Sequence, residues 1–156
     1  MPGVLLWRVT GTLGEKTLLS LSGEFNESTR VEELCKIKGP LVVDLGGVNR
    51  INSTGVRALL TWLEGASRNG TVEAERCSHA IVSQLNMLPE LARLVTVTSF
   101  LAPMECPKCF QEQEVLVRIP PDRHPRFPEE RCGRCDEEMR LSEPRERYLA
   151  FLNDEC

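Results

Sequence analysis

Four cysteines in the last third of the chain constrain its fold more than any other feature of the sequence. They form two Cys-x-x-Cys pairs, Cys106-Pro-Lys-Cys109 and Cys132-Gly-Arg-Cys135, with twenty-two residues between the pairs. Two such pairs can place four thiolates around one tetrahedral Zn²⁺, which is the closed coordination of structural zinc sites. We therefore expect residues 103–156 to fold around a structural metal ion.

This arrangement resembles a zinc ribbon, in which two cysteine knuckles flank a strand and a loop. Between the pairs lie a strand-like segment at residues 114–119 and a proline-rich loop. The ribbon as a whole has too few apolar residues for a core of its own, and a structural zinc ion can contribute about 10–16 kcal/mol to folding. The resemblance implies a Zn²⁺ ion held by all four cysteines, with no open position for catalysis.

Three other uses of these cysteines remain open from the sequence. Iron in a rubredoxin-like site uses similar spacing. Two disulfides would use the same four residues, although a cytosolic chain disfavours them. A redox-active pair is a third use, but the thioredoxin type expects a single pair in a βαβ context. His124 lies between the pairs, and we interpret it as a loop residue because four cysteines already complete a ligand set.

Residues 1–102 alternate strand-like and helix-like segments. The first two strands read as a hairpin with a turn at Gly14-Glu15. Strands that alternate with helices indicate an α/β layer, in which helices cover a sheet. We expect strands at residues 4–13, 16–25, 39–49, 70–77 and 94–102, and helices at residues 26–37, 56–65 and 80–94.

Local signals add detail to these helices and strands. Thr29 and Glu32 have the spacing of a capping box at the start of the first helix. Pro89 is expected to break the third helix. Cys35 and Cys77 lie outside the paired cysteines, and we expect both to be small buried hydrophobic residues.

The stretch at residues 41–63 passes from an apolar strand to a helix through Asn52-Ser53-Thr54-Gly55. We expect Ser53 or Thr54 to be the helix N-cap, a role worth about 1 kcal/mol. The same position suits a phosphate, because free backbone N–H groups and the helix dipole favour negative charge there. A phosphoserine would add about −1.5 to −2 charges without unfolding the helix.

This stretch resembles the central segment of STAS domains, the fold of anti-sigma factor antagonists. In that family an apolar strand ends in Asp, and Asp-Ser-Ser-Gly later opens a helix. Here Asp44 matches the strand Asp, Ser53 the phosphorylated serine, Thr54 the second hydroxyl residue and Gly55 the glycine. The resemblance implies a phosphorylation switch at Ser53, with Thr54 as second candidate and with Asp44, Asn52 and Gly55 supporting it.

The likeness extends over residues from about 3 to 102 and has three departures. Asn52 stands where the family has Asp, and Asn26 replaces the Asp of an earlier motif at residues 21–34. The family's final helix is missing after the last strand, and residues 142–152 of the tail are a candidate to supply it. The fold implied is a STAS-like mixed sheet covered by helices, followed by a small zinc-ribbon appendage.

The resemblance also implies partners. In the family, an unphosphorylated antagonist binds a regulatory serine kinase, and phosphorylation releases it, whereas other members are scaffolds without a switch. We therefore expect a protein partner, either a regulatory serine kinase or anti-sigma-like protein, or another STAS protein. A constitutive scaffold, in which Ser53 serves only as a cap, remains an alternative.

The charge distribution disfavours a nucleic-acid partner. The net charge is −4, and all of the excess lies in residues 103–156, which carry thirteen acidic and nine basic residues. Nucleic-acid binders usually show a basic footprint instead. An adaptor that binds nucleic acid through the ribbon remains a second alternative, and its candidate basic residues are Lys108, Arg118, Arg123, Arg126, Arg131 and Arg134.

The remaining expectations concern catalysis and location. We find no Ser/His/Asp set or pair of carboxylates with a plausible cleft, so we do not expect an enzyme. No apolar run approaches the roughly 18–20 residues that span a bilayer, so no membrane insertion is expected. The first residues lack a basic leader and a small-residue cleavage site, so we expect a cytoplasmic protein.

Overall fold

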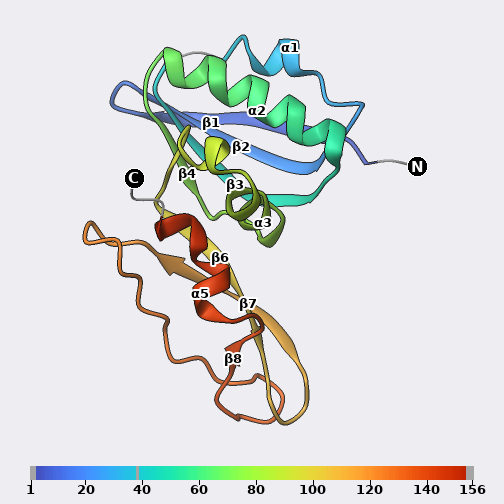
Figure 1. Ribbon diagram of the computed structural model, residues 1–156, viewed down its shortest axis with the longest axis vertical. Helices are drawn as coiled ribbons and strands as arrows, with labels where there is room; N and C mark the ends of the chain where they lie inside the picture. The colour runs from blue at the N-terminus through green and yellow to red at the C-terminus, as the bar shows by residue number, and fades with distance from the viewer. Residues whose placement is uncertain (1–2, 38, 154–156) are drawn as a thin grey trace.

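The computed structural model describes residues 3–37 and 39–153, which form two β-sheets and the helices packed on them (Figure 1). The α/β class predicted from the sequence is confirmed. The first sheet has the order β1-β2-β3-β4-β5, with β1 at Leu5–Leu13, β2 at Lys16–Phe25, β3 at Leu41–Ile51, β4 at Val72–Glu75 and β5 at Thr96–Val97. The second sheet has the order β7-β6-β8, with β6 at Ser99–Glu105, β7 at Glu112–Arg118 and β8 at Arg140–Leu141.

The first sheet is mixed. Strands β1 and β2 form the predicted antiparallel hairpin, with Gly14 in the left-handed region at φ 62° in its turn. The pairs β2–β3, β3–β4 and β4–β5 are all parallel, so helices connect their strands. These helices are α1 at Val31–Leu34, α2 at Ser53–Arg68, α3 at His79–Met87 and α4 at Pro89–Ala92.

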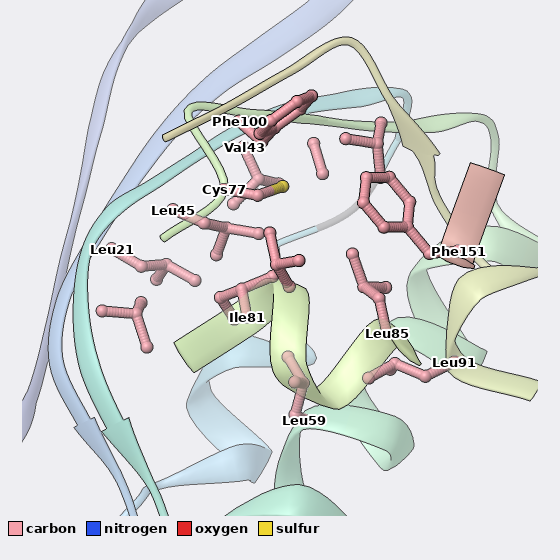
Figure 2. Close-up of a cluster of buried hydrophobic side chains, with 14 of the residues drawn as sticks. Leu21, Val43, Leu45, Leu59, Cys77, Ile81, Leu85, Leu91, Phe100 and Phe151 are labelled. Atoms are coloured by element: carbon pink, nitrogen blue, oxygen red, sulfur yellow. The ribbon is translucent and has the colours of Figure 1, made fainter. Parts of the chain in front are cut away.

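One face of this sheet packs on α2 and α3. Along β2, Leu19 and Leu21 are buried while the intervening Ser20 is more exposed, which is the alternation of a strand with one buried face. Figure 2 shows Leu21, Val43 and Leu45 from the strands together with Leu59 of α2 and with Ile81 and Leu85 of α3. The helices therefore cover the sheet as the sequence predicted.

The start of α1 differs from the prediction. The helix begins at Val31 with Arg30 as its N-cap, and no side chain caps it. The expected capping box of Thr29 and Glu32 is wrong, because the Thr29 hydroxyl accepts a hydrogen bond from the backbone N–H of Asn26 at 2.9 Å instead. The hydroxyl thus stabilises the turn after β2 rather than the helix.

Cys35 and Cys77, the two described cysteines outside the Cys-x-x-Cys pairs, have different environments. Cys77 is fully buried, as predicted. Cys35 is exposed, so that prediction is wrong. Helix α1 has only four residues, and its one buried side chain is Leu34, which leaves Cys35 at the C-cap facing solvent. The break expected at Pro89 is confirmed, since α3 ends at Met87 and α4 begins at Pro89.

The strand expected at residues 94–102 is divided between the two sheets. Strand β5 pairs with β4, whereas β6 pairs along its whole length with β7. A parallel bridge between Cys77 and Phe100 joins β6 to the first sheet. The boundary expected near residue 102 therefore falls inside β6. This strand contributes to the core of the first region, by which we mean the first sheet and its helices α1 to α4. It also belongs to the second region, by which we mean the second sheet, the two cysteine knuckles and the C-terminal helices.

The C-terminal segment returns to the first region. It contains α5 at Arg145–Tyr148 and the 3₁₀ helix η1 at Ala150–Asn153, and α5 lies beside the second sheet (Figure 1). The Tyr148 hydroxyl donates to the backbone oxygen of Leu101 at 2.6 Å. The Asn86 amide of α3 donates to the backbone oxygen of Tyr148 at 3.1 Å and accepts from the Phe151 N–H at 2.8 Å. Phe151 thereby joins the core drawn in Figure 2.

The described helices are short for a bilayer. The longest helix among the described residues, α2, has sixteen residues, and one of its faces is exposed. Among the residues that the structure describes, no helix combines the length and apolar character needed to cross a membrane.

Candidate functional site

The sulfur atoms of Cys106, Cys109, Cys132 and Cys135 all lie within 4.8 Å of one another. The shortest separations join the two knuckles, at 3.4 Å for Cys106–Cys135 and 3.5 Å for Cys109–Cys132. A tetrahedral site with Zn–S bonds of about 2.3 Å places its sulfurs roughly 3.8 Å apart. The four cysteines therefore fit a single metal ion such as zinc.

These separations do not correspond to disulfides. A disulfide requires an S–S distance of about 2.05 Å, and the six described cysteines are all free. Cys156 lies outside the described residues. The set also contains no histidine: His124 is exposed in its loop and is not part of the cluster.

The two knuckles share one backbone design. In each, the first cysteine donates its N–H to the carbonyl five residues later, and its own carbonyl accepts from the N–H four residues later. The residue four positions after the first cysteine, Phe110 in one knuckle and Asp136 in the other, has a left-handed backbone. This conformation turns the chain back toward the first cysteine. The bonds are Cys106 N–H to Gln111 (2.9 Å), Phe110 N–H to Cys106 (3.0 Å), Cys132 N–H to Glu137 (2.8 Å) and Asp136 N–H to Cys132 (2.9 Å).

Backbone N–H groups also point at the sulfur of each first cysteine. The Cys109 N–H lies 3.4 Å from the Cys106 sulfur, and the Arg134 N–H lies 3.4 Å from the Cys132 sulfur. Burial, the largest influence on Cys106, raises its pKa, but the N–H groups and neighbouring thiols lower the pKa more, to about 6. For Cys132, the Arg134 N–H lowers the pKa more than burial raises it.

The second cysteine of each knuckle shows the opposite shift. The Gln111 N–H lowers the pKa of Cys109, yet burial and the neighbouring sulfurs raise it overall. The Glu137 N–H lowers the pKa of Cys135, but the Cys106 sulfur and burial raise it to about 12. Thiolates this close repel one another, which favours the protonated form of Cys109 and Cys135. A divalent ion would favour the thiolate form of all four.

The start of α2 is built differently from the prediction. Asn52 is the N-cap, with extended backbone angles, and its side-chain oxygen accepts from the Gly55 N–H at 2.8 Å. The expectation that Ser53 or Thr54 caps the helix is therefore wrong. Strand β3 continues to Ile51, so Asn52 takes the cap position and the two hydroxyl residues become the first helical residues. Both are exposed.

Gly55 has a packing role at this junction. A Cβ atom at Gly55 would lie 1.9 Å from the backbone oxygen of Phe25, so only glycine lets α2 start this close to β2. The Asn52 N–H donates to the same Phe25 oxygen at 3.1 Å. The Asn52 amide donates to Glu27 at 2.8 Å. The backbone N–H of Glu27, followed by this amide, lowers the pKa of the Glu27 carboxyl.

Asp44 lies away from this junction. Its two carboxylate oxygens accept from Nη1 of Arg76 at 3.0 and 2.9 Å, and one also accepts from the Gly46 N–H at 2.9 Å. At about 3.3 Å per strand residue, Asp44 is roughly 20 Å from Ile51. The structure thus brings Asn52, Ser53, Thr54 and Gly55 together and leaves Asp44 in the body of β3.

Sequence reasoning missed the partners of these residues. Glu27 is twenty-five residues from Asn52 along the chain, and Arg76 is thirty-two residues from Asp44. No local pattern marks either contact, because each depends on which strands become neighbours.

Comparison with known proteins found no family model that matches this chain and no match among curated proteins. The fold class and the cysteine cluster therefore rest on the geometry described above. The STAS and zinc-ribbon resemblances rest on the motifs and are taken up as proposals.

Proposed function

We propose that this protein is a non-enzymatic regulator with a STAS-like domain, and that it binds a partner protein through the surface around the start of α2. The observation that carries the proposal is the state of Ser53. It is the first residue of α2, its side chain is exposed, and among the described residues its hydroxyl has no hydrogen-bond partner. Since Asn52 caps the helix, capping does not explain why a serine stands at the first helical position.

An exposed serine in this place is suited to phosphorylation. The positive end of the helix dipole stabilises negative charge by about 0.3–1 kcal/mol at an exposed position. A phosphate would also introduce repulsion toward the Glu27 carboxylate, which lies 2.8 Å from the Asn52 amide. Phosphorylation would therefore change the charge of the junction and loosen the turn that follows β2, while leaving the core intact.

The mixed sheet and the β3–α2 unit support the STAS-like interpretation. An apolar strand leads directly into a helix that opens with Asn52-Ser53-Thr54-Gly55, in the order that the resemblance requires. The expected partner is a regulatory serine kinase or anti-sigma-like protein, or another STAS protein. Thr54, also exposed, is the second candidate for modification.

We further propose that the cysteine cluster holds a structural Zn²⁺. The sulfurs of Cys106, Cys109, Cys132 and Cys135 would complete its coordination and hold the two knuckles together. Iron would use the same four sulfurs, and elemental analysis of the purified protein distinguishes the two metals.

The test is an affinity capture from native lysate at matched metal content. The wild type, Ser53→Asp and Thr61→Asp are compared, and Thr61 is an exposed residue on the same helix that provides the same charge change. We expect the wild type and Thr61→Asp to capture the same kinase-like or regulatory partner, and Ser53→Asp to lose it. Equal capture by all three variants would instead support a constitutive scaffold.

A further inference from the structure

A small cavity of about 180 Å³ lies between the proline-rich loop and the C-terminal helix. Arg123, His124 and Arg145 line it, and we call it the basic cavity. The neighbouring residues Leu149 and Leu152 provide an apolar part of its wall. This gathering of basic side chains is notable because the region that contains it has more acidic than basic residues.

Both arginines are held in place by backbone oxygens. Nη1 of Arg123 donates to Val97 at 3.0 Å, and Nη2 of Arg145 donates to Pro125 at 2.8 Å. The Arg145 guanidinium also lies 5.0 Å from the centre of the Phe127 ring. A guanidinium has five N–H donors, so each arginine keeps donors for a ligand after making these bonds.

The loop that carries Arg123 and His124 is fixed by its own contacts. The Arg123 N–H donates to Pro120 at 2.9 Å, and the His124 N–H donates to the Asp122 carboxylate at 3.0 Å. Arg123 has a left-handed backbone at φ 62°, which a non-glycine residue rarely adopts. The loop backbone and the two arginine side chains are therefore held before any ligand arrives, which reduces the entropy lost on binding.

The charges around the cavity favour an anion. Two guanidinium groups are permanently charged, and the His124 ring adds a further donor. Glu146 is the one acidic residue that lines the cavity, and it is exposed, as are the three basic residues. Leu149 and Leu152 form the apolar part of the wall beside the arginines.

We infer that the basic cavity binds a phosphate group, either as inorganic phosphate or as a phosphate monoester on a larger molecule. The planar forks of two arginines match the oxygens of a phosphate, which accepts several charge-assisted hydrogen bonds at once. The small volume suits one such group rather than a nucleotide. This inference concerns a second site and does not depend on the proposed switch at Ser53.

The test uses the full-length, metal-loaded protein in calorimetric titrations with two probes. One probe is inorganic phosphate, and the other is a short peptide with one phosphoserine, compared with its unphosphorylated form. Arg123→Gln is expected to weaken phosphate binding by about tenfold or more, because a charged hydrogen-bond donor is lost. Arg126→Gln is the matched control, since Arg126 is exposed in the same loop and does not line the cavity.

Glu146→Gln provides a second test that does not require removal of a loop contact. It should strengthen phosphate binding by about threefold, because one repulsive charge disappears from the cavity wall. If Arg123→Gln fails to fold, this variant decides the outcome, and an unchanged affinity overturns the inference.

The two probes separate the sources of the phosphate. Tighter binding of inorganic phosphate assigns the cavity to the free anion, and tighter binding of the phosphopeptide assigns it to a phosphorylated protein. The inference is overturned if neither probe binds at millimolar concentration, or if Arg123→Gln and Arg126→Gln bind phosphate equally well.

Discussion

The first sheet buries its large side chains against helices, whereas the second sheet ends in a cluster of four cysteine sulfurs. Of the twelve largest fully buried side chains in the described residues, ten precede β6, Phe100 lies in β6, and Tyr148 follows it. The largest fully buried side chains are thus concentrated in the first region. The second region buries smaller side chains and the cysteines themselves, and a metal ion held by the four sulfurs would add to what burial provides there.

The comparison also separates two kinds of dependence on sequence. In the first region many apolar residues share the stabilisation, so each contributes a part. In the second region the knuckles depend on four sulfurs and on the backbone bonds around Cys106 and Cys132. A single substitution should therefore have a larger and more local effect at the cysteine cluster than in the sheet covered by helices.

Metal removal should have the largest effect. We expect chelation of the proposed zinc ion to destabilise the second sheet by about 10 kcal/mol or more, because structural zinc contributes on that scale. Cys132→Ser removes one of the four ligands and should act in the same direction. Hydrogen exchange followed by mass spectrometry should then show loss of protection in β7 and β8 while β2 and β3 stay protected. Cys35→Ser is the control, since Cys35 is exposed and outside the cluster. Equal loss of protection in both sheets would refute the expectation that the two regions are stabilised separately.

A large-to-small substitution in the first core should have the next largest effect. Leu59 is 1% exposed, so Leu59→Ala is expected to lower the free energy of unfolding by about 2–5 kcal/mol. Chemical denaturation measures this loss, and the metal content should remain unchanged. Leu6→Ala is the control, because Leu6 is 62% exposed and should change stability by no more than about 0.5 kcal/mol. Metal loss in Leu59→Ala below its unfolding transition would argue against separate stabilisation.

The contact between the regions should give an intermediate effect. Tyr148→Phe removes the hydroxyl that donates to Leu101, so we expect a loss of about 1–2 kcal/mol. Hydrogen exchange should show faster opening of both β6 and α3, because the backbone oxygen of Tyr148 also accepts a hydrogen bond from Asn86 of α3. Faster exchange confined to the second sheet would show that the contact does not couple the regions.

The smallest effects concern the start of α2. Asn52→Ala should cost about 1 kcal/mol, because it removes the N-cap bond to Gly55. Ser53→Ala should change the free energy of unfolding by less than about 0.5 kcal/mol, because the Ser53 hydroxyl does not cap the helix. Thermal unfolding of the two variants gives the comparison. A larger loss for Ser53→Ala than for Asn52→Ala would restore Ser53 as the cap.

The alternation of strands and helices in the first region was predicted from apolar periodicity, and so was the turn at Gly14. The choice of N-cap was not, because Asn, Ser and Thr are all good caps and sequence alone does not say where β3 ends. Pairing decides this: Phe25 of β2 lies opposite Ile51, which extends β3 up to Asn52. The cap is thus set by a contact between distant residues.

The cysteine cluster was more predictable, because the spacing of the two Cys-x-x-Cys pairs is set by ligand chemistry rather than by packing. The change of sheet at β6 was not predictable from residues 94–102, which read as one strand. That change depends on β7, which offers β6 a partner along its full length. The pairs Asp44–Arg76 and Asn52–Glu27 escaped prediction for the same reason.

Strand β6 fixes how the chain tolerates changes in length. Phe100 of β6 packs in the core, and Cys106, the first residue after β6, begins the first knuckle. Because side chains alternate across a strand, one inserted residue between them would turn Cys106 to the opposite face. The proline-rich stretch between β7 and Cys132 carries no such alternation. Outside the contacts of Arg123 and His124, that stretch should therefore tolerate insertions and deletions better than β6 does.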